Sequence, residues 1–444
     1  MTNEDLSEAM TFGTEPYISK TYAEEESTDL WGKVWQHACR VEEIPHVGDF
    51  VTYEILNDSI IIVRAADDTI RAYHNVCMHR GRRLLAGCGR LKQLVCRFHG
   101  WRWNLHGENT HVVERADWGG ALEAGRIRLR DVRCDTWGGW VWINLDSNCR
   151  PLREYLASAA DMLDPFMLQN MRYRWRQWVH FDCNWKTAME AFIETYHVEG
   201  THSQLLRFAD FYTWSRAEGL HSCHGFAARE VTEDIAQNNT IIRSGKGGDP
   251  RVTTAELQAE ILETVNASTT ETLVKAAARL VDELPPGTST EQVLAHFVTA
   301  ARRDDAERGV IWPEVDPDHY ARTGINWHIF PNLSIQHGFS FALCYRARPA
   351  PDFNPDRCIF EVSVLELFAP GEEPRTEWVY AQATEQNWRK VLAQDFANMS
   401  EVQRGMKSQA FPGTLPNPKQ ERPVTNFQRN LARYMHRIGP TKLR

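Results

Sequence analysis

NVCMHRG at residues 75–81 and CRFHGW at residues 96–101 are two turn-like loops, and each contains a cysteine–histidine pair. A glycine in each loop lets backbone N–H groups face a bound cluster. Two thiolates and two imidazoles fit a tetrahedral zinc ion or a [2Fe–2S] cluster with two cysteines on one iron and two histidines on the other. The alternating order favours the cluster, because each loop then supplies one ligand to each iron. The four candidate ligands are Cys77, His79, Cys96 and His99.

Short β-rich segments surround these loops, from Gly48 to about Asn144. Gly, Asn and Asp separate them at intervals of roughly 8–12 residues, which is typical of an all-β sandwich or barrel. A helical segment that begins near Pro151 marks the end of this pattern. We therefore expect an all-β domain over residues 46–150, with the cysteine–histidine loops inside it.

A second candidate metal site lies in NWKTAMEAFIETYHVEGTH, where Glu194-x-x-His197 precedes His202. We expect a helix over residues 187–200, in which Glu194 and His197 share one face. His202 approaches His197 only if Gly200 ends this helix and turns the chain. Two neutral imidazoles and one carboxylate form the facial triad of non-heme Fe(II), with positions left open for O₂ and substrate. From the residues alone, the carboxylate is Glu194 or a distant acid.

Together these segments resemble the alpha (terminal oxygenase) subunits of Rieske non-heme iron aromatic-ring-hydroxylating oxygenases. The resemblance rests on CMHRG, CRFHGW and NWKTAMEAFIETYHVEGTH and covers nearly the whole chain. It implies a [2Fe–2S] Rieske cluster in the first site and a mononuclear Fe(II) held by His197 and His202. The family's third iron ligand is an Asp on the C-terminal helix, which here is Asp395 in AQDFANMSEVQRG. The competing acids are Asp161, Asp164 and Asp182.

The sequence departs from the family pattern at two positions near the second site. Glu194 stands where the family usually has Asp, and Ala191 replaces a common Asn. In the family, head-to-tail trimers place the cluster of one subunit beside the iron of the next, and the acid bridges them. The resemblance therefore implies that Glu194 links His99 of one subunit to His197 of its neighbour.

The resemblance also implies redox partners and an assembly. O₂ is the co-substrate, and electrons from NAD(P)H arrive through a flavin reductase, a ferredoxin or both. The expected assembly is a homotrimer, α3, or an α3β3 complex with a small subunit. A basic segment around the first site supports an acidic electron carrier as partner; its residues are Arg80, Arg82, Arg83, Arg90, Lys92, Arg97 and Arg102.

The expected fold class is α+β, with the all-β Rieske domain followed by a larger α+β catalytic domain. We assign residues 151–444 to the catalytic domain, built on an antiparallel sheet with helices. A helical insertion is expected at about 230–310. Residues 1–45 form a polar arm and an amphipathic helix, roughly Ser19 to Cys39, that we assign to the catalytic domain.

Composition excludes several function classes. A net charge of −9 and a pI near 6.0 argue against a nucleic-acid binder. The sequence has no run of 18 or more uncharged apolar residues, so we expect no membrane span. The start, MTNEDLSEAM, is acidic rather than signal-like, which favours a cytoplasmic protein with reduced thiols.

The expected substrate is a hydrophobic, aromatic or polycyclic, small molecule. Candidate apolar lining residues are Trp185, Phe192, Leu205, Leu206, Phe208, Phe211, Trp327, Phe330, Phe339 and Phe341. Histidines that could orient a polar substrate group are His221, His224, His328 and His337.

Two alternatives to an oxygenase of aromatic substrates stay open. One is a Rieske monooxygenase acting on a quaternary ammonium compound, held by an aromatic cage. The other is a Rieske electron carrier, which would stop near residue 150 and lack the second site.

Overall fold

The computed structural model describes residues 6–227 and 248–443, which divide into two compact units. The smaller unit comprises residues 23–157 and 351–353, and the larger unit comprises 1–22, 158–350 and 354–444. Within the described ranges, no helix is both long and apolar enough to cross a membrane.

The smaller unit is a β-structure, in which β4 shows why these residues form strands. Residues 60–63 of β4 are β-branched and fully buried, as a central strand requires. A seven-stranded antiparallel sheet has the order β2-β11-β10-β5-β4-β3-β6, and β7-β8-β9 form a second sheet. The strands are β2 (Gln36–Arg40), β3 (Asp49–Ile55), β4 (Asp58–Ala66), β5 (Thr69–His74), β6 (Cys88–Arg90), β7 (Leu94–Val95), β8 (Arg102–Trp103), β9 (Asn109–His111), β10 (Asp131–Trp137) and β11 (Trp140–Asn144). Short helices of this unit are α3 (Ala124–Ile127) and α4 (Leu152–Leu156), and α2 (Lys20–Glu26) spans the boundary between the two units.

The predicted helix from Ser19 to Cys39 is wrong in its second half. The helical segment ends in a π-helical turn before Gly32, and residues 36–40 form strand β2, which pairs with β11. All five residues of β2 are buried. A strand that is buried on both faces does not need alternating apolar and polar residues, and without that alternation its sequence cannot be distinguished from a buried helix. Because of this pairing, residues 23–45 lie in the smaller unit rather than with residues 1–22.

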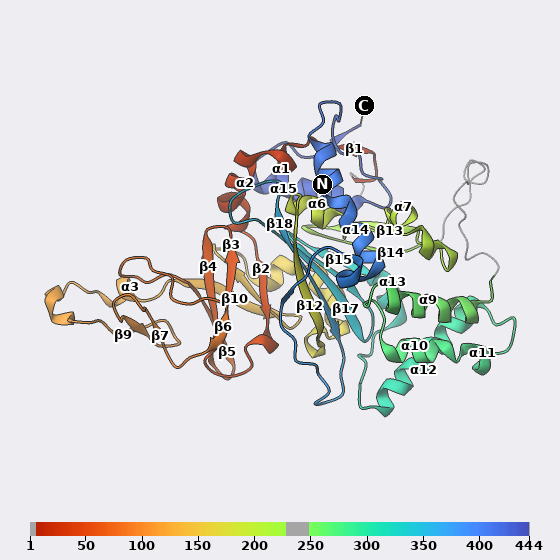
Figure 1. Ribbon diagram of the computed structural model, residues 1–444, viewed down its shortest axis with the longest axis horizontal. Helices are drawn as coiled ribbons and strands as arrows, with labels where there is room; N and C mark the ends of the chain where they lie inside the picture. Colours follow the sequence, from red (N-terminus) through yellow and green to blue (C-terminus); the bar gives the residue numbers. More distant parts are fainter. Residues whose placement is uncertain (1–5, 228–247, 444) are drawn as a thin grey trace. The chain divides into compact units, whose positions relative to one another are not determined.

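The larger unit is built on an eight-stranded sheet of order β13-β14-β15-β16-β17-β18-β12-β19. Its pairs are antiparallel except β12 with β19. The strands are β12 (Arg172–Phe181), β13 (Thr213–Glu218), β14 (His221–Phe226), β15 (Asn326–Ile329), β16 (Leu333–His337), β17 (Phe341–Pro349), β18 (Cys358–Glu366) and β19 (Val379–Tyr380); β1 (Met10–Thr11) pairs separately with β20 (Thr441–Lys442). Packed against this sheet are α6 (Trp185–Glu190), α14 (Glu385–Met406) and α15 (Arg422–Tyr434) (Figure 1). Further helices are α1 (Glu15–Ile18), α5 (Ser158–Leu163), α7 (Val198–Thr201) and α13 (Pro317–Thr323).

The predicted helical insertion is present between β14 and β15, where its described part forms a helical subdomain (Figure 1). Its helices are α9 (Pro250–Thr264), α10 (Glu271–Ala278), α11 (Leu280–Glu283) and α12 (Thr290–Glu307). The predicted break at residues 285–290 separates α11 from α12, where Ser289 caps α12 through a capping box. The first residues of the predicted insertion, up to 247, lie outside the described residues.

The N-terminal arm is anchored to the larger unit by a buried carboxyl group. Tyr17 Oη and Gln428 Nε2 both donate hydrogen bonds to Glu190 Oε1, at 2.7 and 2.6 Å. Burial raises the pKa of Glu190 to about 7, since a low-dielectric environment disfavours the charged carboxylate.

Candidate functional site

The two cysteine–histidine loops have the same backbone hydrogen bonds. The Cys77 N–H donates to the carbonyl of Arg82 at 2.8 Å, and the Gly81 N–H donates to the carbonyl of Cys77 at 3.0 Å. In the second loop, Cys96 bonds to Trp101 and Gly100 bonds to Cys96, at 2.8 and 2.9 Å. The glycines have φ angles of 75° and 71°, which residues with side chains rarely adopt. Each loop therefore presents its cysteine in the same way.

The four predicted cluster ligands lie together in the smaller unit. Cys77 and Cys96 are buried and their thiols contact each other, while the rings of His79 and His99 lie with centroids 4.6 Å apart. The backbone N–H groups of His79 and Arg80 donate to the Cys77 sulfur, as donors to a cluster sulfur do.

An unsatisfied nitrogen tests whether these residues fit a metal cluster. His79 stacks on Trp101 with an interplanar angle of 5°, and its Nδ1 is buried with no hydrogen-bond partner among the described residues. Such an atom is costly to bury, and coordination to iron would use its lone pair. The donor set of two thiols and two imidazoles therefore fits a [2Fe–2S] group.

The second site brings together His197, His202 and Asp395, and their ligand atoms all lie within 4.8 Å of one another. Asp395 Oδ1, on α14, lies 2.7 Å from His202 Nε2 and 3.6 Å from His197 Nε2. Asp395 and His202 are buried, whereas His197 is one-quarter exposed. This group does not include Asp161, Asp164 or Asp182.

The backbone brings the two histidines together in a different way from the predicted one. The helix expected over residues 187–200 is interrupted, because α6 ends at Glu190 and α7 begins only at Val198. His197 and His202 are the residues that flank the single turn of α7. Gly200 lies inside this turn without a positive φ, so the predicted helix-ending role of Gly200 is wrong. The two rings converge because one helical turn separates them.

Each of these histidines is held through its other ring nitrogen. Glu194 Oε1 lies 2.6 Å from His197 Nδ1, and Glu194 Oε2 accepts the His197 backbone N–H at 3.1 Å. His202 Nδ1 lies 3.0 Å from Gln394 Oε1, which also accepts a hydrogen bond from Gln204 Nε2 at 2.8 Å. A hydrogen bond donated at Nδ1 leaves the lone pair of Nε2 free for a metal.

Sequence reasoning did not find Gln394 and Gln204. Gln394 precedes Asp395 on a helix, where adjacent residues point about 100° apart, so nothing in the sequence indicates that both serve the same histidine.

The electrostatics of the site follow from burial and from Glu194. Burial lowers the pKa of His197, but the Glu194 carboxylate outweighs it and raises this pKa to about 9. Burial lowers the pKa of the nearby His224 to about 4, so His224 is neutral at physiological pH. Burial also raises the pKa of Glu421 to about 7, with Glu194 adding to the effect.

A cavity of about 150 Å³ adjoins the three candidate iron ligands. Its walls are mostly apolar or aromatic and come from the sheet, the α6–α7 segment, α14 and the insertion. The apolar and aromatic lining residues are Ala191, Phe192, Val198, Leu205, Phe211, Phe226, Ile261, Val265, Ile325, Leu343, Tyr345 and Val391.

Few of the predicted lining residues lie at this cavity. Phe192, Leu205 and Phe211 line it, as does His224 among the candidate histidines. The other seven apolar candidates and the histidines at 221, 328 and 337 are not among its lining residues. They pack elsewhere in the larger unit; Trp327 and Phe330, for example, are completely buried.

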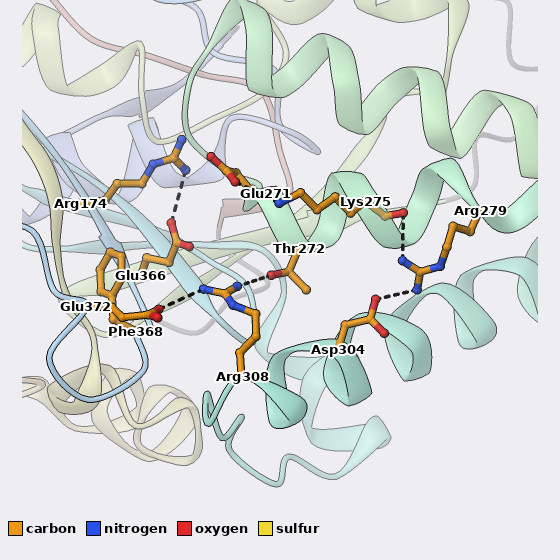
Figure 2. Close-up of a pocket in the computed structure, with 10 residues that line it drawn as sticks. All are labelled: Arg174, Glu271, Thr272, Lys275, Arg279, Asp304, Arg308, Glu366, Phe368 and Glu372. Atoms are coloured by element: carbon orange, nitrogen blue, oxygen red, sulfur yellow. Dashed lines mark hydrogen bonds and ion pairs between the residues drawn. The ribbon is translucent and has the colours of Figure 1, made fainter.

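A second cavity, of about 490 Å³, lies where the insertion meets the sheet and is lined by charged residues (Figure 2). These charges pair with one another: Arg174 with Glu366 at 3.4 Å, and Arg279 with Asp304 at 2.6 Å. Arg308 donates to Thr272 at 2.7 Å (Figure 2). The charges of this cavity therefore form a balanced network, in which Arg174 and Glu366 join two strands and the other two pairs join α10 to α12 and its C-terminal end.

Comparison with known protein families identifies two domains, in the same order as the sequence predicts. A model of the Rieske [2Fe-2S] domain matches residues 34–117, and a model of the ring hydroxylating alpha subunit (catalytic domain) matches residues 168–437, more than half of the chain. The chain belongs to the ring-hydroxylating alpha-subunit family. The predictions of family, fold class, oxygenase class and of [2Fe–2S] and iron cofactors are thereby confirmed for this alpha subunit.

Two characterised relatives act on quaternary ammonium compounds. The alpha subunit is 29% identical over 192 residues to the glycine betaine monooxygenase oxygenase subunit of Pseudomonas aeruginosa, covering 43% of this chain and 44% of the relative. It is also 29% identical over 198 residues to the carnitine monooxygenase oxygenase subunit of Escherichia coli, covering 44% and 53%. The matched stretches thus span about half the length of these relatives.

Solved structures share the fold of this alpha subunit over nearly its whole length. A quaternary ammonium Rieske monooxygenase matches with a TM-score of 0.65 and 17% identity, covering 98% of each chain. Naphthalene 1,2-dioxygenase with indole in its active site matches with a TM-score of 0.63 and 18% identity, covering 96% of this chain and 92% of the other. Similarity at this level of identity concerns the fold alone.

Proposed function

We propose that this alpha subunit is the terminal oxygenase component of a multicomponent Rieske system, which uses O₂ and NAD(P)H-derived electrons to hydroxylate a hydrophobic, aromatic substrate. The observation that carries this proposal is the convergence of His197 Nε2, His202 Nε2 and Asp395 Oδ1 beside a mostly apolar cavity. Two imidazoles and one carboxylate suit Fe(II) and leave positions for O₂ and substrate.

The proposed cluster ligands are Cys77, Cys96, His79 and His99. The matching backbone of the two loops and the unpartnered His79 Nδ1 support this assignment. A cluster held there would supply electrons singly, and a mononuclear iron held by His197, His202 and Asp395 would supply the redox chemistry that activates O₂. The chain itself contributes fixed imidazole orientations and a mostly apolar cavity beside the candidate iron ligands.

Glu194 is the proposed bridge between subunits of a trimer. It accepts two hydrogen bonds from His197 of its own chain, and a carboxylate has further lone pairs. One of these would accept the ring N–H of His99 from the neighbouring subunit. Glu194 would then fix both imidazoles and shorten the path of the electron between them.

The proposed redox partner, a ferredoxin or flavin reductase, would dock on the basic segment of the smaller unit. All seven basic side chains there are exposed. Arg83 pairs with Glu54 and Arg90 pairs with Asp49, whereas Lys92, Arg97 and Arg102 form no ion pair within the described residues. These three remain available to an acidic partner. A cytoplasmic location stays a prediction.

Oxidation of a quaternary ammonium compound is the second candidate function. It is favoured by the glycine betaine and carnitine monooxygenases among the relatives. The rings of Phe192, Phe211, Phe226 and Tyr345 line the cavity and could surround a cation.

Reconstitution under ¹⁸O₂ tests these proposals. The purified subunit, combined with a generic ferredoxin and reductase, is given aromatic and quaternary ammonium substrates, and products are analysed by mass spectrometry. We expect ¹⁸O in an aromatic product, with one or two atoms separating monooxygenase from dioxygenase. The His202→Ala variant should lose mononuclear iron and product but keep the Rieske electron paramagnetic resonance signal. A wild type with zinc and no acid-labile sulfide would contradict the proposal.

A further inference from the structure

One row of polar side chains crosses the sheet at the floor of the iron-site cavity. His224 on β14 is the register partner of Asn326 on β15, which is the partner of Gln336 on β16. All three residues line the cavity, and the next residue in the row, Leu343, is apolar. Register partners lie about 5 Å apart, so the row places polar groups at defined intervals along an otherwise apolar wall.

The hydrogen bonds within the protein leave different capacities along this row: a second Nδ2 proton on Asn326, a ring nitrogen on His224 and the whole NH₂ group on Gln336. Asn326 Nδ2 donates to the carbonyl of Phe192 at 3.1 Å, and its Oδ1 accepts a hydrogen bond from Ser334 at 2.9 Å. His224 donates one ring N–H to the carbonyl of Ile193, which leaves its second nitrogen as an acceptor. Gln336 Oε1 accepts a hydrogen bond from Ser268 Oγ at 2.9 Å, so its amide group keeps both N–H donors.

The orientation of Gln336 is fixed by the insertion. Ser268 belongs to the loop after α9 and has a positive φ of 56°, as does Asn266 at 57°. The loop is held in this conformation by β12: Arg174 donates to Asn266 Oδ1 at 2.6 Å and to the carbonyl of Thr269 at 3.1 Å. Arg174 is itself paired with Glu366 (Figure 2). Because Ser268 donates to Oε1, the Gln336 amide presents Nε2 rather than oxygen to the remaining space.

Charge and size restrict the ligand further. Lys and Arg are absent from the described residues that line the cavity, so an anionic substrate group would find no basic partner there. The Glu194 and Asp395 carboxylates face the two histidines, where Asp395 is a proposed iron ligand and Glu194 the proposed bridge, so both have roles other than pairing with a substrate cation. Burying an unpaired charge is costly. An apolar cavity of about 150 Å³ holds a molecule the size of benzene.

We propose that this cavity selects an uncharged, single-ring substrate with one hydrogen-bond acceptor, such as a carbonyl or ether oxygen, and that Gln336 Nε2 donates to that acceptor. Gln336 is then a specificity-determining residue, and Ser268 positions it. This inference rests on the proposed function and narrows its substrate class. It excludes betaine-type zwitterions, whose carboxylate the described cavity does not pair.

Equilibrium binding to the anaerobic, metal-replete subunit tests the proposal without turnover. Isothermal titration compares acetophenone, which has an acceptor, with cumene, which has none, and with benzoate and glycine betaine, which have a carboxylate. We expect acetophenone to bind about 3- to 10-fold more tightly than cumene, as one net hydrogen bond gives. Benzoate and glycine betaine should bind at least tenfold more weakly than acetophenone.

Variants assign the effect to Gln336. Gln336→Leu should abolish the preference for acetophenone over cumene, whereas the exposed Gln409→Leu, a matched control, should keep it. Ser268→Gly, which tolerates the positive φ, should reduce the preference about 2- to 3-fold. A preference that survives in Gln336→Leu, tighter binding of a carboxylate, or no binding of any probe would overturn the inference. Iron content and the cluster signal are measured on the same preparation, so that failure of this inference can be distinguished from failure of the proposed function. A preparation that lacks iron or the cluster signal would contradict the proposed function.

Discussion

We expect Gln394 to influence, through its contact with His202, how tightly the second site binds metal, and replacing Gln394 by Met tests this. Without metal, the His202 ring proton can reside on Nε2, where Asp395 Oδ1 accepts it at 2.7 Å. Metal binding requires the other tautomer, with the proton on Nδ1, and Gln394 Oε1 accepts that proton at 3.0 Å. The Gln394→Met variant keeps the side-chain length but leaves Nδ1–H without its acceptor in the metal-bound state.

The structure sets the size of the effect. An N–H that loses its buried acceptor costs about 1–3 kcal/mol, and about 1.4 kcal/mol corresponds to a tenfold change in affinity. We therefore expect Fe(II) affinity to fall roughly 10- to 100-fold, the range typical when a partner of a metal-bound histidine is removed. Gln394→Glu, which retains an acceptor, should keep wild-type affinity, and Gln204→Met should weaken it by a few-fold only.

Anaerobic Fe(II) titration against a competing chelator measures the affinity, and the visible absorbance of the cluster serves as an internal control. The cluster absorbance should be unchanged in all three variants, because the cluster ligands belong to the other unit. Wild-type affinity in Gln394→Met would refute the reasoning. Equal losses in the Met and Glu variants would also refute it, since they would indicate a packing effect rather than a lost acceptor.

Three further predictions concern the cluster, the proposed bridge and a buried carboxyl group. Cys96→Ala should abolish the red-brown colour, measured as visible absorbance, because a methyl group cannot replace a thiolate ligand. Glu194→Gln should retain cluster and iron but slow single-turnover oxidation of the cluster. The reason is that one terminal atom becomes an N–H donor that faces the imidazole N–H groups. If the variant mainly loses mononuclear iron, Glu194 is an iron ligand rather than a bridge. Burial raises the pKa of Glu190 from 4.5 in the unfolded chain to about 7 in the fold. The folded protein therefore binds a proton more tightly at this carboxyl group than the unfolded chain does. This adds up to about 3 kcal/mol to the free energy of unfolding below pH 4.5, and the contribution is lost as the pH rises through 7. In urea unfolding, Glu190→Gln should therefore gain stability over wild type at pH 8 but not at pH 4; equal differences at both pH values would contradict this.

The sequence was sufficient for the features that depend on residue type and spacing. The alternating cysteine–histidine pairs led to the cluster loops, and the segment around His197 together with the family's C-terminal Asp led to the group that the structure brings together. Helical periodicity also located α9, α10 and α12 within the insertion.

Tertiary packing determined what the sequence could not predict. The interruption between α6 and α7 occurs in a segment with good helical periodicity, and strand β2 is buried on every side, so neither has a local signature. Most predicted lining residues are apolar side chains of the core, because hydrophobicity does not distinguish a cavity wall from a packed interior. Ser268 reaches the cavity only through a loop conformation imposed by Arg174, from a strand about ninety residues earlier.

The residues proposed to bind iron and the residues proposed to select the substrate belong to different segments of this enzyme, because the loop that orients Gln336 is attached to β12. The candidate iron ligands lie on α14 and around α7, whereas the contact that orients Gln336 comes from the loop after α9, which is held by hydrogen bonds from Arg174 and by the ion pair of Arg174 with Glu366. Substitutions at the edge of the insertion can therefore alter which molecules are accepted without altering the chemistry that is performed on them. For protein engineering, the surface of the insertion is a starting point for new substrate ranges that leaves the metal-binding residues untouched.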